Sequence, residues 1–308
     1  DLVRSRGLGD VYKRQEGWLE GGRPWLELSV VRASVGLYVP VRLLHRKRFT
    51  LTNLQVMKFL ALIPARYAST RFPAKPLATL GGKPIIQRVY ERVARVFPEV
   101  CVATDDDRIF QTVTQFGGRA VMTSESHRSG TDRCFEAYTN LGSDADVIVN
   151  VQGDEPFIAA SQLEAVMSCF EDETTEIATL VKPFASDTPI DVLENPNTPK
   201  VVVGDEGQAL YFSRSVIPYL RGVDRNEWTA HHTYLKHIGL YAYRAEALRR
   251  ITALPQGDLE KCESLEQLRW LQAGLRIRVA TTEVETIGID TPEDLAAAER
   301  FLAAHPEL

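Results

Sequence analysis

A cluster of cationic side chains follows an apolar run near residue 60 of the 308-residue chain. The run FLALI (59–63) leads directly into PARYASTRFPAKPL (64–77), which carries Arg66, Arg71 and Lys75. An arginine guanidinium offers a planar fork of donors to phosphate oxygens, and a lysine ammonium offers a mobile point charge. Three cations spaced in this way after a strand can surround a polyphosphate. We therefore predict a phosphate-binding loop, with a solvated basic turn as the alternative interpretation.

Glycine-rich phosphate motifs do not occur in the sequence. Neither GxxxxGK[ST] nor GxGxxG is found, and LGGKP (80–84) is a plain turn. Any phosphates at this loop would be held by side chains more than by a nest of glycine amides.

Two aspartates stand at the ends of other strand-like segments and are candidate Mg²⁺ ligands. Asp154 in VNVQGDEP (149–156) follows an apolar run, with Gly153 allowing close backbone approach, and Asp290 in GIDTPEDL (288–295) precedes a helix start. Proteins commonly hold Mg²⁺ through one or two carboxylates plus substrate phosphates. The alternative for Asp154 is an ordinary turn, and for Asp290 a helix N-terminus.

The elements around these residues alternate between strand and helix patterns. Such a series predicts an α/β fold of three layers, in which helices cover both faces of a mostly parallel mixed sheet. Ligands of such sheets bind outside the carboxyl ends of the strands, so the charged loops should gather at one edge. The strands are expected at 59–65, 99–105, 119–123 and 146–156, and the helices at 83–97, 106–118 and 130–141.

In the middle of the chain, the alternation of strand and helix patterns gives way to strand patterns. Strand patterns at 177–184, 199–214 and 234–244 are joined by loops, which predicts an antiparallel insertion over 180–243 that extends the sheet and offers a dimer contact. A helix at 264–274, a strand at 276–282 and a capped helix at 291–305 should complete the fold.

Composition excludes several classes of protein. The net charge of −5 and pI of about 5.8 argue against a nucleic-acid coat or a membrane-surface protein. No apolar run approaches the roughly 20 residues of a spanning helix. The four cysteines are scattered without metal-ligand spacing, which favours reduced thiols and a cytoplasmic location.

Residues 1–56 differ from the rest. They contain no methionine, hold ten Lys/Arg against five Asp/Glu, and show no strand or helix period. A back-translation of DVYKRQ (10–15) resembles the end of a transposon-type sequencing adapter. We expect a non-native or disordered leader over 1–56 and a single catalytic domain over 57–308. An organellar transit peptide is the alternative, which Glu16, Glu20 and Glu27 weaken.

From Met57 to Phe301 the motifs together resemble one family. In order they are IPARYASTRFPAKPL, VATDDDRI, SGTDR, VNVQGDEP, ALYFSR, KHIGLYAYR, LEQLR and GIDTPEDL. They resemble the 3-deoxy-manno-octulosonate (Kdo) cytidylyltransferases, also called CMP-Kdo synthetases. One departure is Ala74, which stands where the family usually has glycine, so the loop backbone must accommodate a Cβ there.

The resemblance implies a nucleotide-diphospho-sugar transferase type of fold and an enzyme active as a homodimer. It implies transfer of CMP from CTP to the anomeric hydroxyl of Kdo, giving CMP-Kdo and diphosphate for lipopolysaccharide synthesis. Mg²⁺ is the implied cofactor, and no nucleic-acid or membrane partner is implied.

The resemblance also implies roles for individual residues. Arg66, Arg71 and Lys75 would hold the CTP phosphates, with Lys75, Arg66 and Asp154 as the catalytic residues. Asp154 and Asp290 would be the metal ligands. The base and ribose would lie near Asp105, Ser129, Gly130, Thr131 and Arg133. The sugar pocket would draw on Gln152, Arg214, His237, Tyr241, Glu266 and Gln267.

The residue types agree with these implied roles. The Arg214 guanidinium could pair with the Kdo carboxylate, and the amide and carboxylate side chains could bond sugar hydroxyls. Without the resemblance, His237 and Tyr241 would be interpreted as core residues.

Three alternatives stay open at this point. The first is a cytidylyltransferase for another acid sugar, such as 8-amino-Kdo or sialic acid. The second is a glycosyltransferase, for which DDD (105–107) is only a superficial metal motif because it stands at a helix start. The third is a non-catalytic nucleotide sensor, which the presence of every cation and both aspartates disfavours.

Overall fold

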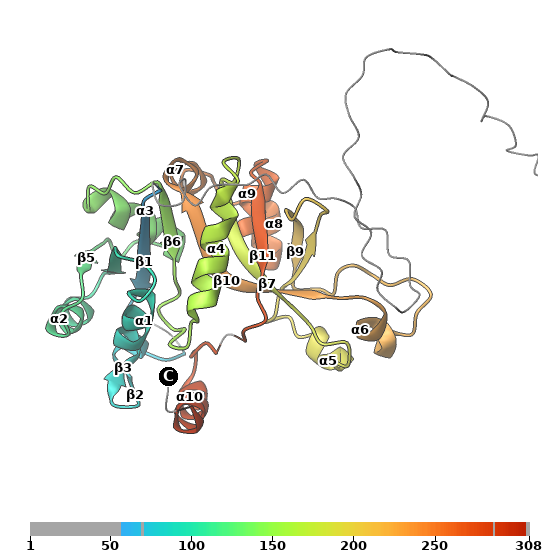
Figure 1. Ribbon diagram of the computed structural model, residues 1–308, viewed down its shortest axis with the longest axis horizontal. Helices are drawn as coiled ribbons and strands as arrows, with labels where there is room; N and C mark the ends of the chain where they lie inside the picture. The colour runs from blue at the N-terminus through green and yellow to red at the C-terminus, as the bar shows by residue number, and fades with distance from the viewer. Residues whose placement is uncertain (1–56, 69–70, 286, 306–308) are drawn as a thin grey trace, which may run out of the picture. The chain divides into compact units, whose positions relative to one another are not determined.

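The computed structural model describes residues 57–68, 71–285 and 287–305, and the leader expected over 1–56 lies outside them. The described residues form a nine-stranded sheet with helices on both faces (Figure 1). Its strands are β1 (Phe59–Ala65), β4 (Val100–Thr104), β5 (Ala120–Met122), β6 (Val147–Asn150), β7 (Ile177–Pro183), β8 (Lys200–Val203), β9 (Ala209–Ser213), β10 (Leu235–Arg244) and β11 (Ile277–Thr281).

Parallel pairs are in the majority along the main path of the sheet. The order is β11-β7-β10-β6-β1-β4-β5, and β8 lies off this path, pairing with β10 and β9. The pairs of β1 with β4 and β6, β4 with β5, and β7 with β11 are parallel, whereas β10 is antiparallel to its neighbours. A second sheet pairs β2 (Thr79–Leu80) with β3 (Lys83–Pro84). The expected fold class is therefore confirmed.

The segment 180–243 shows its antiparallel character in two places. Strand β10 lies inside the sheet between β6 and β7, and β8 and β9 form an antiparallel ladder beside it. Strand β7, in contrast, runs parallel to β11. The segment thus supplies interior strands as well as an extension of the sheet.

Helices cover the two faces in separate groups. Helices α1 and α4 lie in front of the sheet in Figure 1, where α1 contacts β1 and β4, and α4 contacts β7, β10 and β11. Helices α3 and α7 contact β6 from the other face. The helices are α1 (Ile85–Val93), α2 (Asp107–Gln115), α3 (Gly130–Asn140), α4 (Ala160–Ser168), α5 (Ile190–Leu193), α6 (Trp228–His231), α7 (Ala245–Thr252), α8 (Asp258–Glu263), α9 (Gln267–Gln272) and α10 (Pro292–Ala304). Three 3₁₀ turns are η1 (Lys75–Leu77), η2 (Cys169–Glu171) and η3 (Arg225–Glu227).

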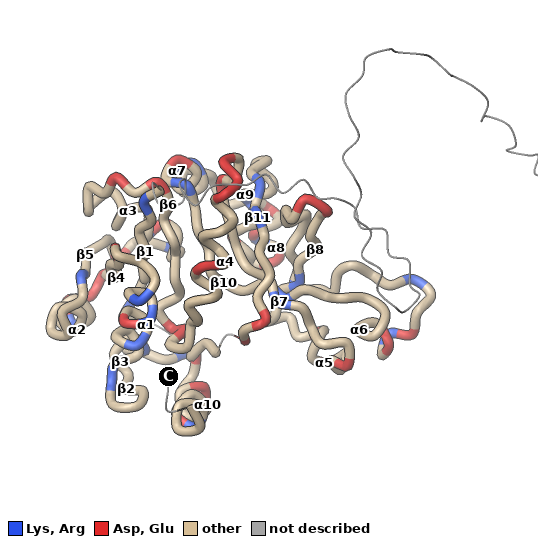
Figure 2. Tube along the Cα trace, in the orientation of Figure 1, with Lys and Arg blue, Asp and Glu red and all other residues tan. Residues whose placement is uncertain are grey.

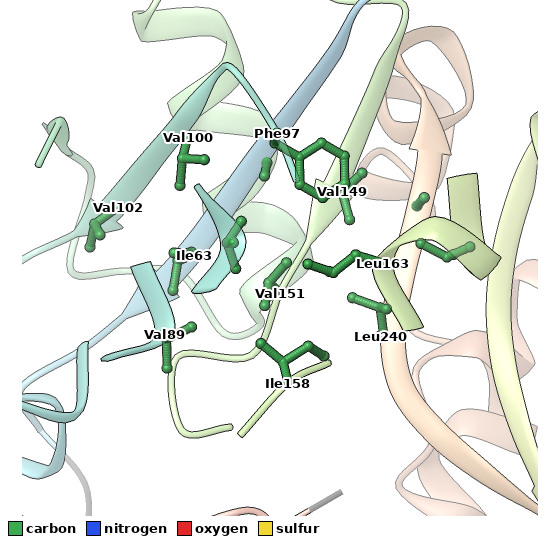
Figure 3. Packing of buried hydrophobic residues seen from close by; sticks show 14 of the residues in the cluster. Ile63, Val89, Phe97, Val100, Val102, Val149, Val151, Ile158, Leu163 and Leu240 are labelled. Atoms are coloured by element: carbon green, nitrogen blue, oxygen red, sulfur yellow. The ribbon is translucent and has the colours of Figure 1, made fainter. Parts of the chain in front are cut away.

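Strand β1 is buried on both faces because its side chains alternate between two cores. Phe59, Ala61 and Ile63 pack into the cluster under α1 and α4, whereas Leu60 and Leu62 pack into the cluster under α3, α7 and α9. Figure 3 shows the first cluster, in which Val89 and Leu163 approach the strand residues. The continuous apolar run that predicted this strand therefore reflects burial from both sides.

A smaller cluster lies beyond the ends of β7 and β10, around Leu193, Trp228 and Tyr234. Across the described residues, no helix combines the length and apolar character that crossing a bilayer requires.

Candidate active site

An open cleft lies where β1 and β6 end, with a volume of about 380 Å³. The expected convergence of charged loops at this edge is therefore seen in the structure. Figure 2 shows basic and acidic segments side by side near the end of β1. The lining residues are Pro64, Ala65, Arg66, Arg71, Lys75, Pro76, His127, Arg128, Ser129, Gly130, Arg133, Gln152, Gly153, Asp154 and Asp290.

Lys75 lies between the two aspartates. Its Nζ is 2.5 Å from Oδ2 of Asp154 and 3.1 Å from Oδ1 of Asp290. Arg71 approaches the other oxygen of Asp290, at 3.0 Å. The Lys75 side chain is only 14% exposed, so water screens these pairs less than surface pairs. Residues from three distant parts of the sequence thus meet at one ammonium group.

Backbone contacts bring Asp154 and Asp290 together. The amide of Ile289 donates a hydrogen bond to the carbonyl oxygen of Asp154 at 3.0 Å, which ties the loop before α10 to the loop after β6. Gly153 lies so close to β1 that a Cβ at this position would be 2.8 Å from the carbonyl oxygen of Pro64. The site therefore depends on a glycine for its spacing.

The donor set fits a magnesium ion that is completed by substrate. Carboxylate oxygens of Asp154 and Asp290 already converge on one cation, the ammonium of Lys75. No group of three or more His, Cys, Asp or Glu within the described residues could by itself hold a metal. Two carboxylates are nevertheless enough for Mg²⁺, which keeps waters and takes phosphate oxygens as its other ligands.

The cationic loop turns sharply just before Lys75. Ala74 adopts φ 60° and ψ 18°, the left-handed region that disfavours residues with a Cβ, and it precedes η1. The guanidinium carbon of Arg108 lies 3.3 Å from the centre of the Tyr67 ring, so α2 supports the loop. The unusual backbone explains why glycine would suit this position better.

The N-terminus of α3 forms one wall of the cleft. The Ser129 side chain accepts a hydrogen bond from the amide of Asp132 and caps the helix. Arg133 is almost fully buried and donates to Thr123 and Asp105, each at 2.6 Å. Within the described residues Asp105 is not one of those lining the cleft. Asp105 instead lies behind Arg133 and accepts a hydrogen bond from its guanidinium group.

Most of the residues expected in the sugar pocket lie outside this cleft. Of the six, Gln152 alone is among the described lining residues, and it donates to the carbonyl oxygen of Gly239 on β10 at 3.1 Å. The expected nucleotide residue Thr131 is also absent from the described lining residues. Its hydroxyl donates to Glu266 at 2.7 Å and so connects α3 to the residues before α9.

Arg214 is held by backbone groups. Its guanidinium donates to the carbonyl oxygens of Glu263 at 2.5 Å, Pro196 at 2.7 Å and Ser264 at 3.2 Å. Its own amide donates to the Glu263 carboxylate at 2.9 Å. Two of the five N–H donors of this guanidinium are left for a ligand.

The other expected sugar residues lie in surroundings that favour neutral groups. Burial lowers the pKa of His237 to about 4, and the rings of Phe212 and Tyr241 flank its imidazole. Burial raises the pKa of Tyr241, with a further contribution from the Glu266 carboxylate. Burial also raises the pKa of Glu266, although Thr131 and Arg269 oppose this effect.

Two of these residues carry buried polar atoms without a partner in the described part of the chain. They are the hydroxyl oxygen of Tyr241 and Nε2 of Gln267. Buried polar groups are nearly always satisfied in native proteins, so unpaired ones call for an explanation.

Three residues at the site were not predicted from the sequence. His127 and Arg128 line the cleft, and His127 bonds to Glu136 of α3. Their position just before SGTDR is a usable signal, because a helix N-terminus with adjacent cations attracts phosphate. Burial, with a smaller effect of Asp154, raises the pKa of Glu155 to about 8. Nothing in the sequence indicates that one carboxylate oxygen of Glu155 is buried without a partner among the described residues.

Comparison with solved structures supports the fold. A 4-diphosphocytidyl-2C-methyl-D-erythritol synthase from Anaerococcus prevotii is 15% identical with a TM-score of 0.51, and covers 80% of this chain and 99% of its own. At this identity the likeness concerns the fold alone.

Closer comparisons identify the family. The family model described as cytidylyltransferase matches residues 60–277. The 3-deoxy-manno-octulosonate cytidylyltransferase of Phocaeicola vulgatus is 66% identical over 246 residues, 80% of this chain and 98% of that protein. The protein of the same name from Bacteroides thetaiotaomicron is 65% identical, with the same coverage of 80% and 98%. A structure of CMP:2-keto-3-deoxy-manno-octonic acid synthetase complexed with CTP is 43% identical with a TM-score of 0.74, over 82% of this chain and 100% of that one. This chain therefore belongs to the 3-deoxy-manno-octulosonate cytidylyltransferase family.

Proposed function

We propose that this chain transfers CMP from CTP to the anomeric hydroxyl of Kdo, releasing CMP-Kdo and diphosphate. The observation that carries the proposal is the convergence of Lys75 and Arg71 with two carboxylates in one cleft. Relatives that are 62 to 66% identical are named for this activity, and the similar synthetase structure contains CTP.

The cations would bind the triphosphate and stabilise the leaving group. Arg66, Arg71 and Lys75 line the cleft together with the N-terminus of α3, whose amides favour anions. Phosphate oxygens would replace the carboxylates as partners of Lys75. Preorganised cations of this kind offset the charge that develops on diphosphate as it leaves. Asp105 would act indirectly in nucleotide binding, by fixing the guanidinium of Arg133.

Asp154 and Asp290 would hold Mg²⁺ in the cleft beside the cationic loop, whose Lys75 contacts both carboxylates. When bound, the ion would polarise the α-phosphate and acidify the attacking hydroxyl. The two carboxylates would also keep Lys75 pointed into the cleft until the nucleotide binds.

The acid sugar would bind near Gln152 and the bulged part of β10. The unpaired hydroxyl of Tyr241 and the unpaired Nε2 of Gln267 suit a ligand that is rich in hydroxyl groups. The two remaining N–H donors of Arg214 suit its carboxylate. Glu266 and His237 would complete the pocket as hydrogen-bond partners.

A homodimer and a cytoplasmic location are further parts of the proposal. Tyr219 is 77% exposed, Leu210 54% and Val192 49%, and all three lie in the segment expected to form the dimer contact. These exposed apolar side chains are candidate contacts for a second copy of the chain. All four cysteines are free thiols, which suits a reducing compartment.

The test measures diphosphate release from CTP and Mg²⁺ with Kdo, 8-amino-Kdo and N-acetylneuraminate as separate acceptors. We expect turnover with Kdo and loss of turnover when Mg²⁺ is chelated. Turnover with only one of the other two sugars would show that the substrate assignment is wrong. Absence of turnover with all three would contradict the proposed activity.

A further inference from the structure

Strand β10 contains a bulge opposite Thr179 of β7. Ile238 pairs with Leu180, but Thr179 pairs with Tyr241, so two residues of β10 lie between partners that are adjacent on β7. Such a bulge interrupts the ladder and leaves backbone groups that need other partners. The Thr179 hydroxyl is fully buried at this point.

The Thr179 hydroxyl lies within hydrogen-bonding distance of three groups, although it has only one proton to donate. Its Oγ1 is 2.9 Å from the carbonyl oxygen of Leu240, 3.2 Å from that of Ile238 and 3.1 Å from Nε2 of His237. Both carbonyl oxygens can only accept, so the hydroxyl proton must be directed at them to avoid unfavourable contacts between oxygens. The third contact is then a hydrogen bond that Nε2–H of His237 donates to Oγ1.

The surroundings of His237 keep its ring in the neutral form. The imidazole lies 5.2 Å from the rings of both Phe212 and Tyr241, measured between ring centres, and burial is the cause that lowers its pKa to about 4. A neutral imidazole carries one N–H and one acceptor nitrogen. With the proton on Nε2, the acceptor is Nδ1, for which the described residues supply no partner.

We propose that Thr179 is a positioning residue, which fixes the neutral tautomer of His237 with its proton on Nε2 and so presents Nδ1 as an acceptor for a hydroxyl group of the acid sugar. The proposal rests on the proposed function, which places His237 in the sugar site. Gln152 connects the cleft with the bulge of β10, because it lines the cleft and donates a hydrogen bond to Gly239 within the bulge.

The test begins with the full-length chain labelled with ¹⁵N at histidine. Two-dimensional ¹H–¹⁵N spectra at pH 7 distinguish the two neutral tautomers from each other and from imidazolium, and a His237→Gln variant assigns the signal. We expect Nε2 of His237 to be protonated and Nδ1 to be unprotonated. A protonated Nδ1, in either the other tautomer or the imidazolium, would overturn the proposal. This result does not depend on which substrate the enzyme uses.

Three variants then test Thr179 itself. Thr179→Val removes the hydroxyl at nearly constant shape, Thr179→Ser keeps it, and Thr175→Val removes another buried hydroxyl that donates to a carbonyl, that of Cys169 at 2.7 Å. Thr179→Val should shift the His237 signals and raise KM for Kdo about five- to tenfold, the scale of one hydrogen bond, with KM for CTP unchanged. Thr179→Ser should keep the wild-type His237 signals and the wild-type KM for Kdo. Thr175→Val should also leave the signals and this KM unchanged.

Two results would overturn the role of Thr179. One is a Thr179→Val enzyme with wild-type spectra and an unchanged KM for Kdo. The other, if Thr179→Val does not fold, is a folded Thr179→Ser enzyme whose His237 is no longer protonated on Nε2. If no acid sugar is a substrate, the proposed function fails, while the spectra still decide the tautomer.

Discussion

At the scale of single residues, the site is organised around one cation between two carboxylates. Lys75 is mostly buried and bonds to Asp154 and Asp290, so its charge has fixed partners before a nucleotide binds. Holding these three groups in place costs stability unless each is paired, because a buried unpaired charge is expensive. The arrangement places both signs of charge in one cleft, as the proposed binding of an anionic substrate and Mg²⁺ requires.

We expect Lys75→Ala to lower kcat by about 10²- to 10³-fold, because one preorganised electrostatic partner of a leaving group is worth that much. The fold should survive, since Lys75 lies at the edge of the sheet. The matched control is Lys83→Ala, which removes an exposed lysine paired with Glu91 and should leave kcat unchanged. Steady-state rates at saturating CTP and Kdo provide the measurement. Unaltered kinetics in Lys75→Ala would mean that the cationic loop is only a solvated turn.

Ala74→Gly should raise the melting temperature. The left-handed backbone of Ala74 costs about 1–2 kcal/mol for a residue with a Cβ, and glycine removes this cost. Glycine also gains entropy in the unfolded chain, which offsets part of the effect, so we expect a net stabilisation of about 0.5–1 kcal/mol. Thermal or urea unfolding measures it. A destabilised variant would show that the backbone at this position is not strained.

At the scale of elements, close approach of two loops brings together Asp154 and Asp290, the two proposed metal ligands. Gly153 has the Pro64 carbonyl oxygen 2.8 Å from where its Cβ would be, and that oxygen belongs to β1 and cannot move freely. The loop after β6 also carries the hydrogen bond to Ile289. A small displacement here would separate Asp154 from Asp290.

Gly153→Ala should therefore reduce both stability and turnover. Overpacking against backbone costs about 1–3 kcal/mol. Gly288→Ala is the matched control, because a Cβ there meets no atom within 4 Å and lies in a loop of the same site. Melting curves and the Mg²⁺ dependence of the rate are the measurements. Equal behaviour of the two variants would contradict the close approach.

Helix start signals account for some of the helices that could be predicted from the sequence. Asp106, Ser129 and Thr291 cap α2, α3 and α10 with their side chains, and all three helices were expected. Helices α4 and α7 were missed. They begin after Ala159 and Arg244, neither of which provides a side-chain cap in the described structure. Without a Ser, Thr, Asp or Asn at these two positions, the strongest local start signal is missing.

The site was predictable where residues follow strand ends and not where pairing is non-local. The charged loops after β1 and β6 could be placed at one edge from the α/β pattern alone. The position of β10 between β6 and β7, and the bulge that sets His237 against Thr179, depend on partners far away in the sequence. Local patterns contain no information on such pairings.

At the scale of the whole molecule, the partly buried His237 makes stability depend on pH. Its pKa is about 4 in the folded chain against 6.5 normally, so the unfolded chain binds a proton that the folded chain does not. The free energy of unfolding should thus fall as the pH drops from 6.5 towards 4, by at most about 3 kcal/mol from this group. A His237→Gln variant lacks this contribution and should lose less stability over the same range. If urea unfolding shows that the wild type and His237→Gln lose the same unfolding free energy over this pH range, the lowered pKa of His237 is contradicted.

Removal of residues 1–56 should leave activity and stability essentially unchanged. The curated relatives are matched over 98% of their length by 80% of this chain, and the family model begins at residue 60. The removed segment has no periodic apolar pattern that could pack on the domain, whereas β1 starts only two residues after Met57. A chain that starts at Met57 should keep its melting temperature within about 2 °C, which corresponds to less than 1 kcal/mol for a domain of this size. Its kcat/KM for Kdo should match that of the full chain in the same buffer. A large drop in either value would show that the segment stabilises the domain, and the catalytic unit would then have to include it.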